Sequence, residues 1–276
     1  MISVRRVQSR SIHVWATSLL TVLMASALAC SRTPTAPSRR ADGSTFTPLS
    51  QEAPPVPPRL SDLPPPHALG AIRFVAFGDS LTYGTLSSFD GRFLYDVPSH
   101  SYPVRLLLGL RQTFPAQSAA FVVVNAGSPG ERASNARDRL QSVLGANDAD
   151  VLLLLEGIND INAGVSPQRA AASVVDLVQV ARLYNVTVLL GLMPQTYDGV
   201  DRMDPVEQVV PFNDELRRLT AGVQNVHIVD LYAAFGSDRS LIGGDGLHPT
   251  PEGYERMAAT FGQRIEDVFP VRGSVQ

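Results

Sequence analysis

The strongest constraint on how this chain of 276 residues can fold is a set of five short, almost wholly apolar runs. Longer stretches with helical periodicity separate these runs. Runs that are apolar on both faces are typical of strands buried in a parallel sheet. Parallel strands need crossover connections, and the stretches between the runs are long enough to supply them as helices. The sequence therefore predicts an α/β fold, with a five-stranded parallel sheet between two layers of helices. The five predicted strands are Ala71–Phe77, Phe121–Asn125, Val151–Glu156, Val186–Met193 and Val226–Asp230.

Apolar residues at helical spacing predict four helices between and after these strands. One helix has a clear start signal, because Ser166 precedes Pro167, and proline is favoured at the first helical position. The same pattern, Thr250-Pro251, precedes the last helix. The predicted helices are Ser101–Thr113, Ser166–Tyr184, Val206–Val223 and Glu252–Val268.

The first 29 residues have the features of a signal peptide rather than of a folded segment. Three arginines precede an apolar run from Val14 to Ala29, which is too short for a comfortable membrane span. The run ends in Ala27–Cys30, which resembles a bacterial lipobox, and Cys30 is the only cysteine of the chain. We therefore expect an exported lipoprotein that is anchored to a membrane through a lipidated Cys30. The alternative is ordinary signal cleavage, with Cys30 left as a passenger.

Residues 30–68 are predicted to be a disordered tether, because ten prolines lie there among Ser, Thr and Ala, and such a segment cannot bury a core. Residues 69–270 then form the folded domain, and 271–276 a short tail. The formal net charge of −3 gives no indication of a basic surface, so no nucleic-acid partner is expected.

Polar, glycine-containing blocks follow the predicted strands. Gly78–Gly84 comes after the first strand, Asn125–Glu131 after the second and Glu156–Asp160 after the third, while Asp245–Pro249 lies beyond the fifth. In an open parallel sheet, ligands bind beyond the carboxyl ends of the strands. We therefore expect the four blocks to meet at one edge of the sheet.

These four blocks, in this order, resemble those of the SGNH hydrolases, also called GDSL esterases and lipases, over residues 71–268. The resemblance implies the flavodoxin-like fold of that family. It also implies that Ser80 is the nucleophile, His248 the base and Asp245 the acid of a catalytic triad.

The resemblance further implies an oxyanion hole made of the backbone N–H groups of Ser80 and Gly127 and the side-chain amide of Asn159. The residue types suit these roles, because a neutral imidazole can take the serine proton and a nearby carboxylate can fix its tautomer. Asp79 is interpreted as a structural residue that binds backbone near the serine, and Asp160 as a cap or a support for the loop of Asn159.

The function predicted is hydrolysis of carboxylic esters through an acyl-enzyme, with short or medium acyl esters or acetylated carbohydrate as substrates. Three alternatives stay open: an acyltransferase with the same machinery, a non-catalytic glycan- or cell-wall-binding lipoprotein, and a metal-dependent hydrolase. The last would use Asp79, Asp160, Asp245 and His248, although no metal or other cofactor is expected. The insertion Thr85–His100 is a lid, an acyl-binding wall or a packed loop, and Pro194–Pro211 is a second candidate wall.

Overall fold

The computed structural model describes residues 3–6, 68–199 and 206–269. The expected tail, nearly all of the expected tether and Cys30 lie outside these residues. The main sheet has five strands, all parallel, in the order β5-β2-β6-β7-β8. In chain order the strands are β2 (Arg73–Gly78), β5 (Val122–Gly127), β6 (Val151–Leu155), β7 (Thr187–Gly191) and β8 (Val226–Val229).

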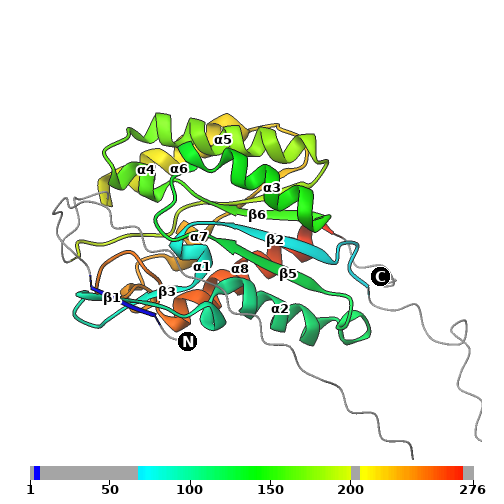
Figure 1. Cartoon of the computed structure of the whole chain (residues 1–276), viewed down its shortest axis with the longest axis horizontal. Helices are drawn as coiled ribbons and strands as arrows, with labels where there is room; N and C mark the ends of the chain where they lie inside the picture. Colours follow the sequence, from blue (N-terminus) through cyan, green and yellow to red (C-terminus); the bar gives the residue numbers. More distant parts are fainter. Residues whose placement is uncertain (1–2, 7–67, 200–205, 270–276) are drawn as a thin grey trace, which may run out of the picture. The chain divides into compact units, whose positions relative to one another are not determined.

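Helices cover both faces of this sheet (Figure 1). On one face lie α3 (Arg137–Asn147), α5 (Pro167–Leu183) and α6 (Val206–Thr220), and on the other α2 (Tyr102–Thr113) and α8 (Pro251–Val268). The predicted three-layer α/β/α fold with a five-stranded parallel sheet is thus confirmed. Short helices at the strand ends complete the set: α1 (Ser80–Tyr83), α4 (Ile158–Asn162) and α7 (Leu231–Phe235).

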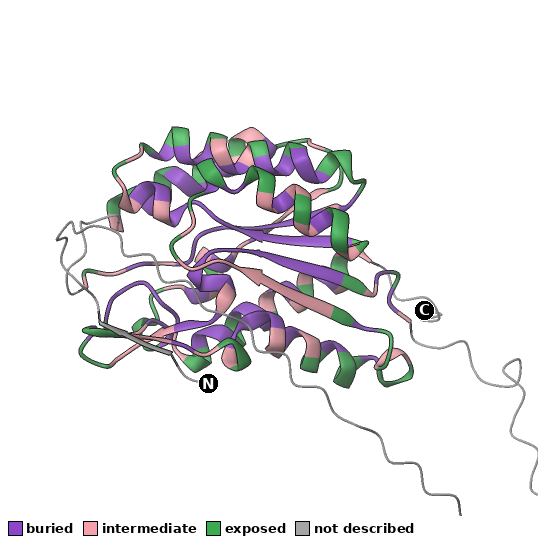
Figure 2. Cartoon of the chain, viewed as in Figure 1, coloured by how far each residue is buried: buried purple, intermediate pink, exposed green. Residues whose placement is uncertain are grey.

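The core lies on both sides of the central strands, which Figure 2 shows as buried along their length. Strand β6 is the apolar sequence VLLLL, and each of its residues is fully buried. Burial of one such side chain contributes roughly 1.5–3 kcal/mol. In the layer formed by α2 and α8, the rings of Tyr102 and Phe261 stack with their centroids 4.9 Å apart, which joins the two helices.

The register of the sheet brings three strand ends to one edge. Gly78, the last residue of β2, lies opposite Gly127 of β5 and Leu155 of β6. A Cβ atom on Gly78 would lie 2.2 Å from the Leu155 carbonyl oxygen, so only glycine fits there. The segments that follow these three strands therefore begin side by side.

Two parts of the fold differ from the sequence-based expectations. Helix α3 was not predicted, because only Leu140 and Leu144 of its residues are buried, too few for a clear apolar face. The insertion Thr85–His100 holds an antiparallel hairpin of β3 (Thr85–Ser87) and β4 (Phe93–Asp96).

A second sheet is formed where β1 (Ser3–Arg6) pairs antiparallel with β4, in the order β1-β4-β3. This strand lies within the segment expected to be a signal peptide, of which the structure describes only these four residues. Within the described part of the chain, no helix is both long enough and apolar enough to cross a membrane.

Candidate active site

Three side chains from distant parts of the chain form one hydrogen-bonded series. The Nε2 atom of His248 lies 2.9 Å from the hydroxyl oxygen of Ser80. The other ring nitrogen, Nδ1, lies 2.5 Å from a carboxylate oxygen of Asp245. All three residues are buried, with 5–7% of their surface exposed. The structure therefore brings the predicted nucleophile, base and acid into contact.

Ser80 is placed by a single helical turn that begins immediately after β2. The Asp79 carboxylate caps this turn by accepting a hydrogen bond of 2.9 Å from the Leu81 N–H. Gly84 ends it in the left-handed region, with φ at 107°, where a glycine is favoured. Ser80 is thus the first residue of α1, and its backbone N–H is one that the helix itself cannot bond.

Asp245 and His248 share one tight turn. The second oxygen of the Asp245 carboxylate accepts bonds from the N–H groups of Leu247, at 3.1 Å, and His248, at 3.0 Å. Burial alone would raise the pKa of Asp245. The bonds from the His248 side chain and from these two amides outweigh burial, so the pKa is lowered. Asp245 is therefore held as a carboxylate, oriented for the imidazole.

Neighbouring loops hold this turn in place. The Asp245 N–H donates to the Ser87 hydroxyl at 3.3 Å, from the end of β3. On another side, Gly246 lies so close to Tyr197 that a Cβ atom would meet its carbonyl oxygen at 2.1 Å. Behind the turn, the hydroxyl of Tyr254 in α8 donates to the Thr85 carbonyl at 2.7 Å. The β3–β4 hairpin and α8 are therefore both tied to the site.

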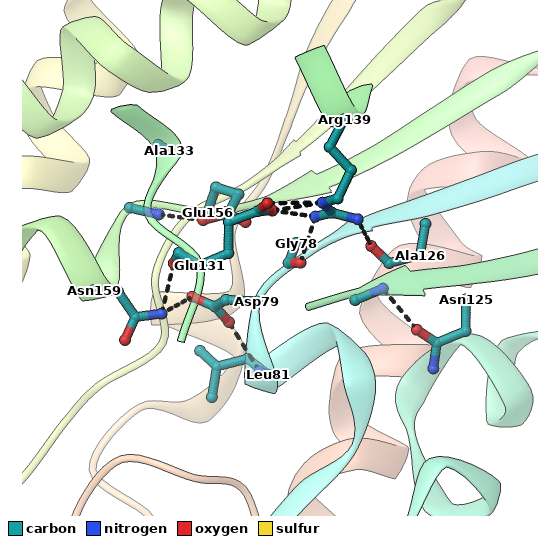
Figure 3. A network of polar contacts seen from close by, with 12 residues as sticks. Gly78, Asp79, Leu81, Asn125, Ala126, Glu131, Ala133, Arg139, Glu156 and Asn159 are labelled. Carbon is teal, nitrogen blue, oxygen red and sulfur yellow. Dashed lines mark hydrogen bonds and ion pairs between the residues drawn. The ribbon is translucent and has the colours of Figure 1, made fainter. Parts of the chain in front are cut away.

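Asn159 extends from α4 toward Asp79 and the loop after β5 (Figure 3). Its Nδ2 donates to the Glu131 carbonyl oxygen at 2.8 Å and to the Asp79 carboxylate at 3.2 Å. The next residue, Asp160, accepts from the N–H groups of Ala133, at 2.7 Å, and Ser134, at 3.3 Å. Asp160 thus ties α4, which carries Asn159, to the segment that precedes α3, in keeping with its interpretation as a support.

The side chains around Asn159 form a group rich in carboxyl groups (Figure 3). Asp79 is fully buried, which raises its pKa, and Glu131 nearby adds to the rise. The Leu81 N–H bond and His248 oppose these effects, and the pKa is about 7. Burial, together with the charges of Asp79 and Glu131, also raises the pKa of Glu156 well above its ordinary value. One Glu156 oxygen has no hydrogen-bond partner in the described part of the chain.

The structure does not place Gly127 with the other predicted site residues. Its N–H donates to the side-chain oxygen of Asn125 at 3.0 Å, and a Cβ atom there would lie 2.3 Å from the backbone nitrogen of Tyr83. Gly127 therefore lets the end of β5 pack closely against α1.

The glycine that reaches the site is Gly130, which the sequence interpretation did not single out. The Glu131 N–H donates to the Ser128 carbonyl at 3.0 Å, and the φ of Gly130 is +82°. These are features of a type II turn with Pro129 and Gly130 at its two central positions. The dipeptide Pro-Gly is a sequence signal for this turn and could have identified Gly130. Its N–H has no acceptor among the described residues.

A cavity of about 200 Å³ opens at the Ser80 hydroxyl. Its walls carry both the polar side chains described above and a few apolar ones from the hairpin and the loops. The lining residues are Ser80, Thr85, Leu94, Pro129, Gly130, Asn159, Leu247 and His248. The Ser80 hydroxyl, its base His248, the Asn159 side chain and Gly130 thus line one small space.

The sequence pattern of the GDSL-like lipase/acylhydrolase family matches residues 76–256, which is more than half of the chain. The chain belongs to this family. It is accordingly a carboxylic ester hydrolase. A comparison with curated proteins finds no match.

Solved structures share the fold of this GDSL hydrolase. A native aryl esterase from M. smegmatis superposes with a TM-score of 0.63 at 19% identity, over 72% of this chain and 100% of the other. A putative arylesterase from Agrobacterium tumefaciens gives 0.59 at 19% identity, over 72% and 100%. The acetyl xylan esterase AlAXEase gives 0.54 at 18% identity, over 70% and 99%.

The carboxylates of the GDSL hydrolase are engaged with its own backbone and side chains. Asp79, Asp160 and Asp245 each accept at least one backbone N–H bond. Among the residues that the structure describes, no three His, Cys, Asp or Glu side chains are grouped so that they could hold a metal ion.

Proposed function

We propose that this GDSL hydrolase cleaves short-chain carboxylic esters through an acyl-enzyme on Ser80. The observation that carries the proposal is the hydrogen-bonded series from the Asp245 carboxylate through both ring nitrogens of His248 to the Ser80 hydroxyl. This arrangement gives the hydroxyl a base within bonding distance, and gives the base a carboxylate that stabilises its charged form.

In the first half of the reaction, the Ser80 oxygen attacks the ester carbonyl carbon while its proton passes to Nε2 of His248. The tetrahedral intermediate collapses, the C–O bond to the alcohol breaks, and His248 returns the proton to the departing oxygen. In the second half, His248 takes a proton from water, the hydroxide attacks the acyl group, and the carboxylic acid leaves as Ser80 regains its proton.

The negative oxygen of the tetrahedral intermediate needs donors. We assign this role to the N–H groups of Ser80 and Gly130 and to the side-chain amide of Asn159, with Gly130 in place of Gly127. Gly130 lines the cavity, whereas the Gly127 N–H is already bonded to Asn125. The substrate oxygen would displace the longer of the two Asn159 bonds, the one to Asp79. Loss of one such donor typically costs about 3 kcal/mol of barrier.

The cavity volume favours a small acyl group. About 200 Å³ is below the usual range of roughly 300–1,000 Å³ for a small-molecule site, and part of it must hold the reacting carbonyl. Leu94 and Leu247 give the walls an apolar character suited to an acetyl or similar short chain. The acetyl xylan esterase among the structural neighbours acts on an ester of this type, which supports acetylated carbohydrate as one substrate class.

The test is hydrolysis of 4-nitrophenyl acetate by the full chain and by its Ser80→Ala variant. We expect the variant to lose activity by about 10⁴-fold or more while its circular dichroism and melting temperature are retained. A fluorophosphonate probe should label the parent protein and not the variant. Equal rates in the two proteins would show that Ser80 is not the nucleophile. Product analysis with added alcohols then separates hydrolysis from acyl transfer.

A further inference from the structure

Arg139 of α3 makes more polar contacts around the site than the catalytic scheme uses. Its Nη1 donates to the Ala126 carbonyl at 2.6 Å, and its Nη2 to the Gly78 carbonyl at 3.1 Å. Its Nε lies 2.8 Å from both carboxylate oxygens of Glu131, and Nη2 also contacts this carboxylate. The guanidinium lies over the Phe77 ring, 3.8 Å from its centroid. Figure 3 shows the contacts of Arg139 with Ala126, Gly78 and Glu131.

Each acceptor of Arg139 belongs to a segment that carries a proposed oxyanion donor. Gly78 ends β2, two residues before Ser80. Glu131 directly follows Gly130, and its own carbonyl oxygen accepts from the Asn159 amide. One guanidinium is therefore linked to all three donors. It reaches the segments of Ser80 and Gly130 through the backbone carbonyls of Gly78 and Ala126, and it reaches Asn159 through Glu131.

The contacts need the shape of an arginine. A guanidinium presents five N–H donors in a rigid plane, so it can bind two carbonyl oxygens and a carboxylate at the same time. A lysine ammonium carries the same charge but is a single point with three donors, and it cannot reach these acceptors in one plane. The side chain is also largely buried, with 28% of its surface exposed, so water replaces few of the lost bonds.

We propose that Arg139 is a positioning residue for the oxyanion hole, which it holds in a preformed geometry by joining the ends of β2 and β5 to Glu131. This inference rests on the proposed function. Arg139 does not touch the substrate. It fixes the separation of Ser80, Gly130 and Asn159, and such separations matter because a misplacement of about 1 Å can reduce a rate about 100-fold.

The test compares Arg139→Lys with a matched control, Arg218→Lys. Arg218 also forms a two-point ion pair, with Glu215, but on an exposed part of α6. We expect Arg139→Lys to lower kcat for 4-nitrophenyl acetate by about 10- to 100-fold and to change KM by less than about 2-fold. The inhibition constant of a trifluoromethyl ketone should rise by a similar factor, because its adduct with Ser80 places an oxyanion in the hole. Arg218→Lys should leave all three values unchanged.

A second variant, Glu131→Gln, guards against misfolding of the first. It keeps the backbone carbonyl that binds Asn159 but removes the charge that Arg139 binds, so a smaller change in the same direction is expected. If Arg139→Lys melts far below the parent, Glu131→Gln decides the matter alone. An unchanged kcat, or a lower kcat without weaker binding of the ketone, would overturn the inference while leaving the proposed function intact. A parent rate equal to that of Ser80→Ala would overturn both.

Discussion

At the scale of single residues, the site concentrates carboxyl groups where water is scarce. Asp79, Glu131 and Glu156 lie in one network, and the cation that the structure places among them is Arg139. Glu131 takes the ion pair, so the other two carboxyl groups are left to burial, and their pKa values rise.

The raised pKa of Glu156 makes stability depend on pH in a defined direction. In the unfolded chain this carboxyl ionises near its ordinary value of 4.5, but burial resists ionisation in the folded state. The free energy of unfolding should therefore fall as pH rises above that value, by up to about 1.4 kcal/mol per pH unit for one proton. Glu156→Gln removes this loss. The free energy of unfolding of the variant, relative to that of the parent, should therefore be higher at pH 8 than at pH 5.

Urea unfolding at the two pH values measures this difference. The constant cost of burying an amide in place of a carboxyl affects both values equally and cancels in the comparison. Glu207→Gln, an exposed substitution in α6, is the control and should change little with pH. A difference between parent and Glu156→Gln that stays the same at pH 5 and pH 8 would contradict the prediction.

At the scale of elements, the β3–β4 hairpin is the part of the site that the family's four blocks do not include. It contributes Thr85 and Leu94 to the cavity wall, and Ser87 to the turn of Asp245. Of the three interpretations of the insertion, the contacts support those of a wall and of a packed loop. Because it is anchored at both the cavity and Asp245, the hairpin should determine how long an acyl chain can bind.

Leu94→Ala tests this role. Removal of three carbon atoms from the wall should let longer chains enter, and one methylene in an apolar pocket is worth about 10-fold or more in specificity. We expect the ratio of kcat/KM for the hexanoate over the acetate nitrophenyl ester to rise at least about 10-fold. Phe93→Ala is the matched control, because successive strand residues point to opposite faces. An unchanged ratio in Leu94→Ala would mean that another wall limits the chain.

Strands and long helices could be predicted from the sequence because their signals are local. The apolar run Val151–Glu156 contains β6, and Pro167 of the Ser166-Pro167 start signal is the first residue of α5. The proposed triad residues could be identified because each lies in a short polar block: that of Ser80 directly follows β2, and that of Asp245 and His248 lies some fifteen residues beyond β8. Helix α3 could not, since most of its surface is polar. Gly127 and Gly130 lie three residues apart in one block. Only the tertiary structure separates their positions, because Gly127 packs against Tyr83 of α1 whereas Gly130 lines the cavity.

At the scale of the whole molecule, we propose that the folded domain is held at a membrane by a lipid on Cys30 and a proline-rich tether. Cys30 and nearly all of the tether lie outside the described residues, so this proposal rests on the sequence. A single acyl chain binds membranes only weakly, whereas several chains on one cysteine anchor a protein stably.

Expression of the full chain in a bacterium with an alkyne-labelled fatty acid tests the anchor. The parent and Ser80→Ala should both incorporate the label and sediment with membranes, whereas Cys30→Ser should do neither. The label in Cys30→Ser at the level of the parent would refute lipidation at this residue. Release of all three proteins into the soluble fraction would favour ordinary signal cleavage.

The hydrogen bond between His248 and Ser80 joins residues 168 positions apart, whereas Asp245 and His248 are only three apart. The proposed acid and base thus form a local unit that one turn can make early, whereas the proposed nucleophile joins them only after nearly the whole domain has folded. Closure of so long a loop is entropically costly and late in folding. The return of esterase activity during refolding should therefore lag behind the return of the helical circular dichroism signal. The activity would then report when α8, which directly follows His248, docks against the sheet.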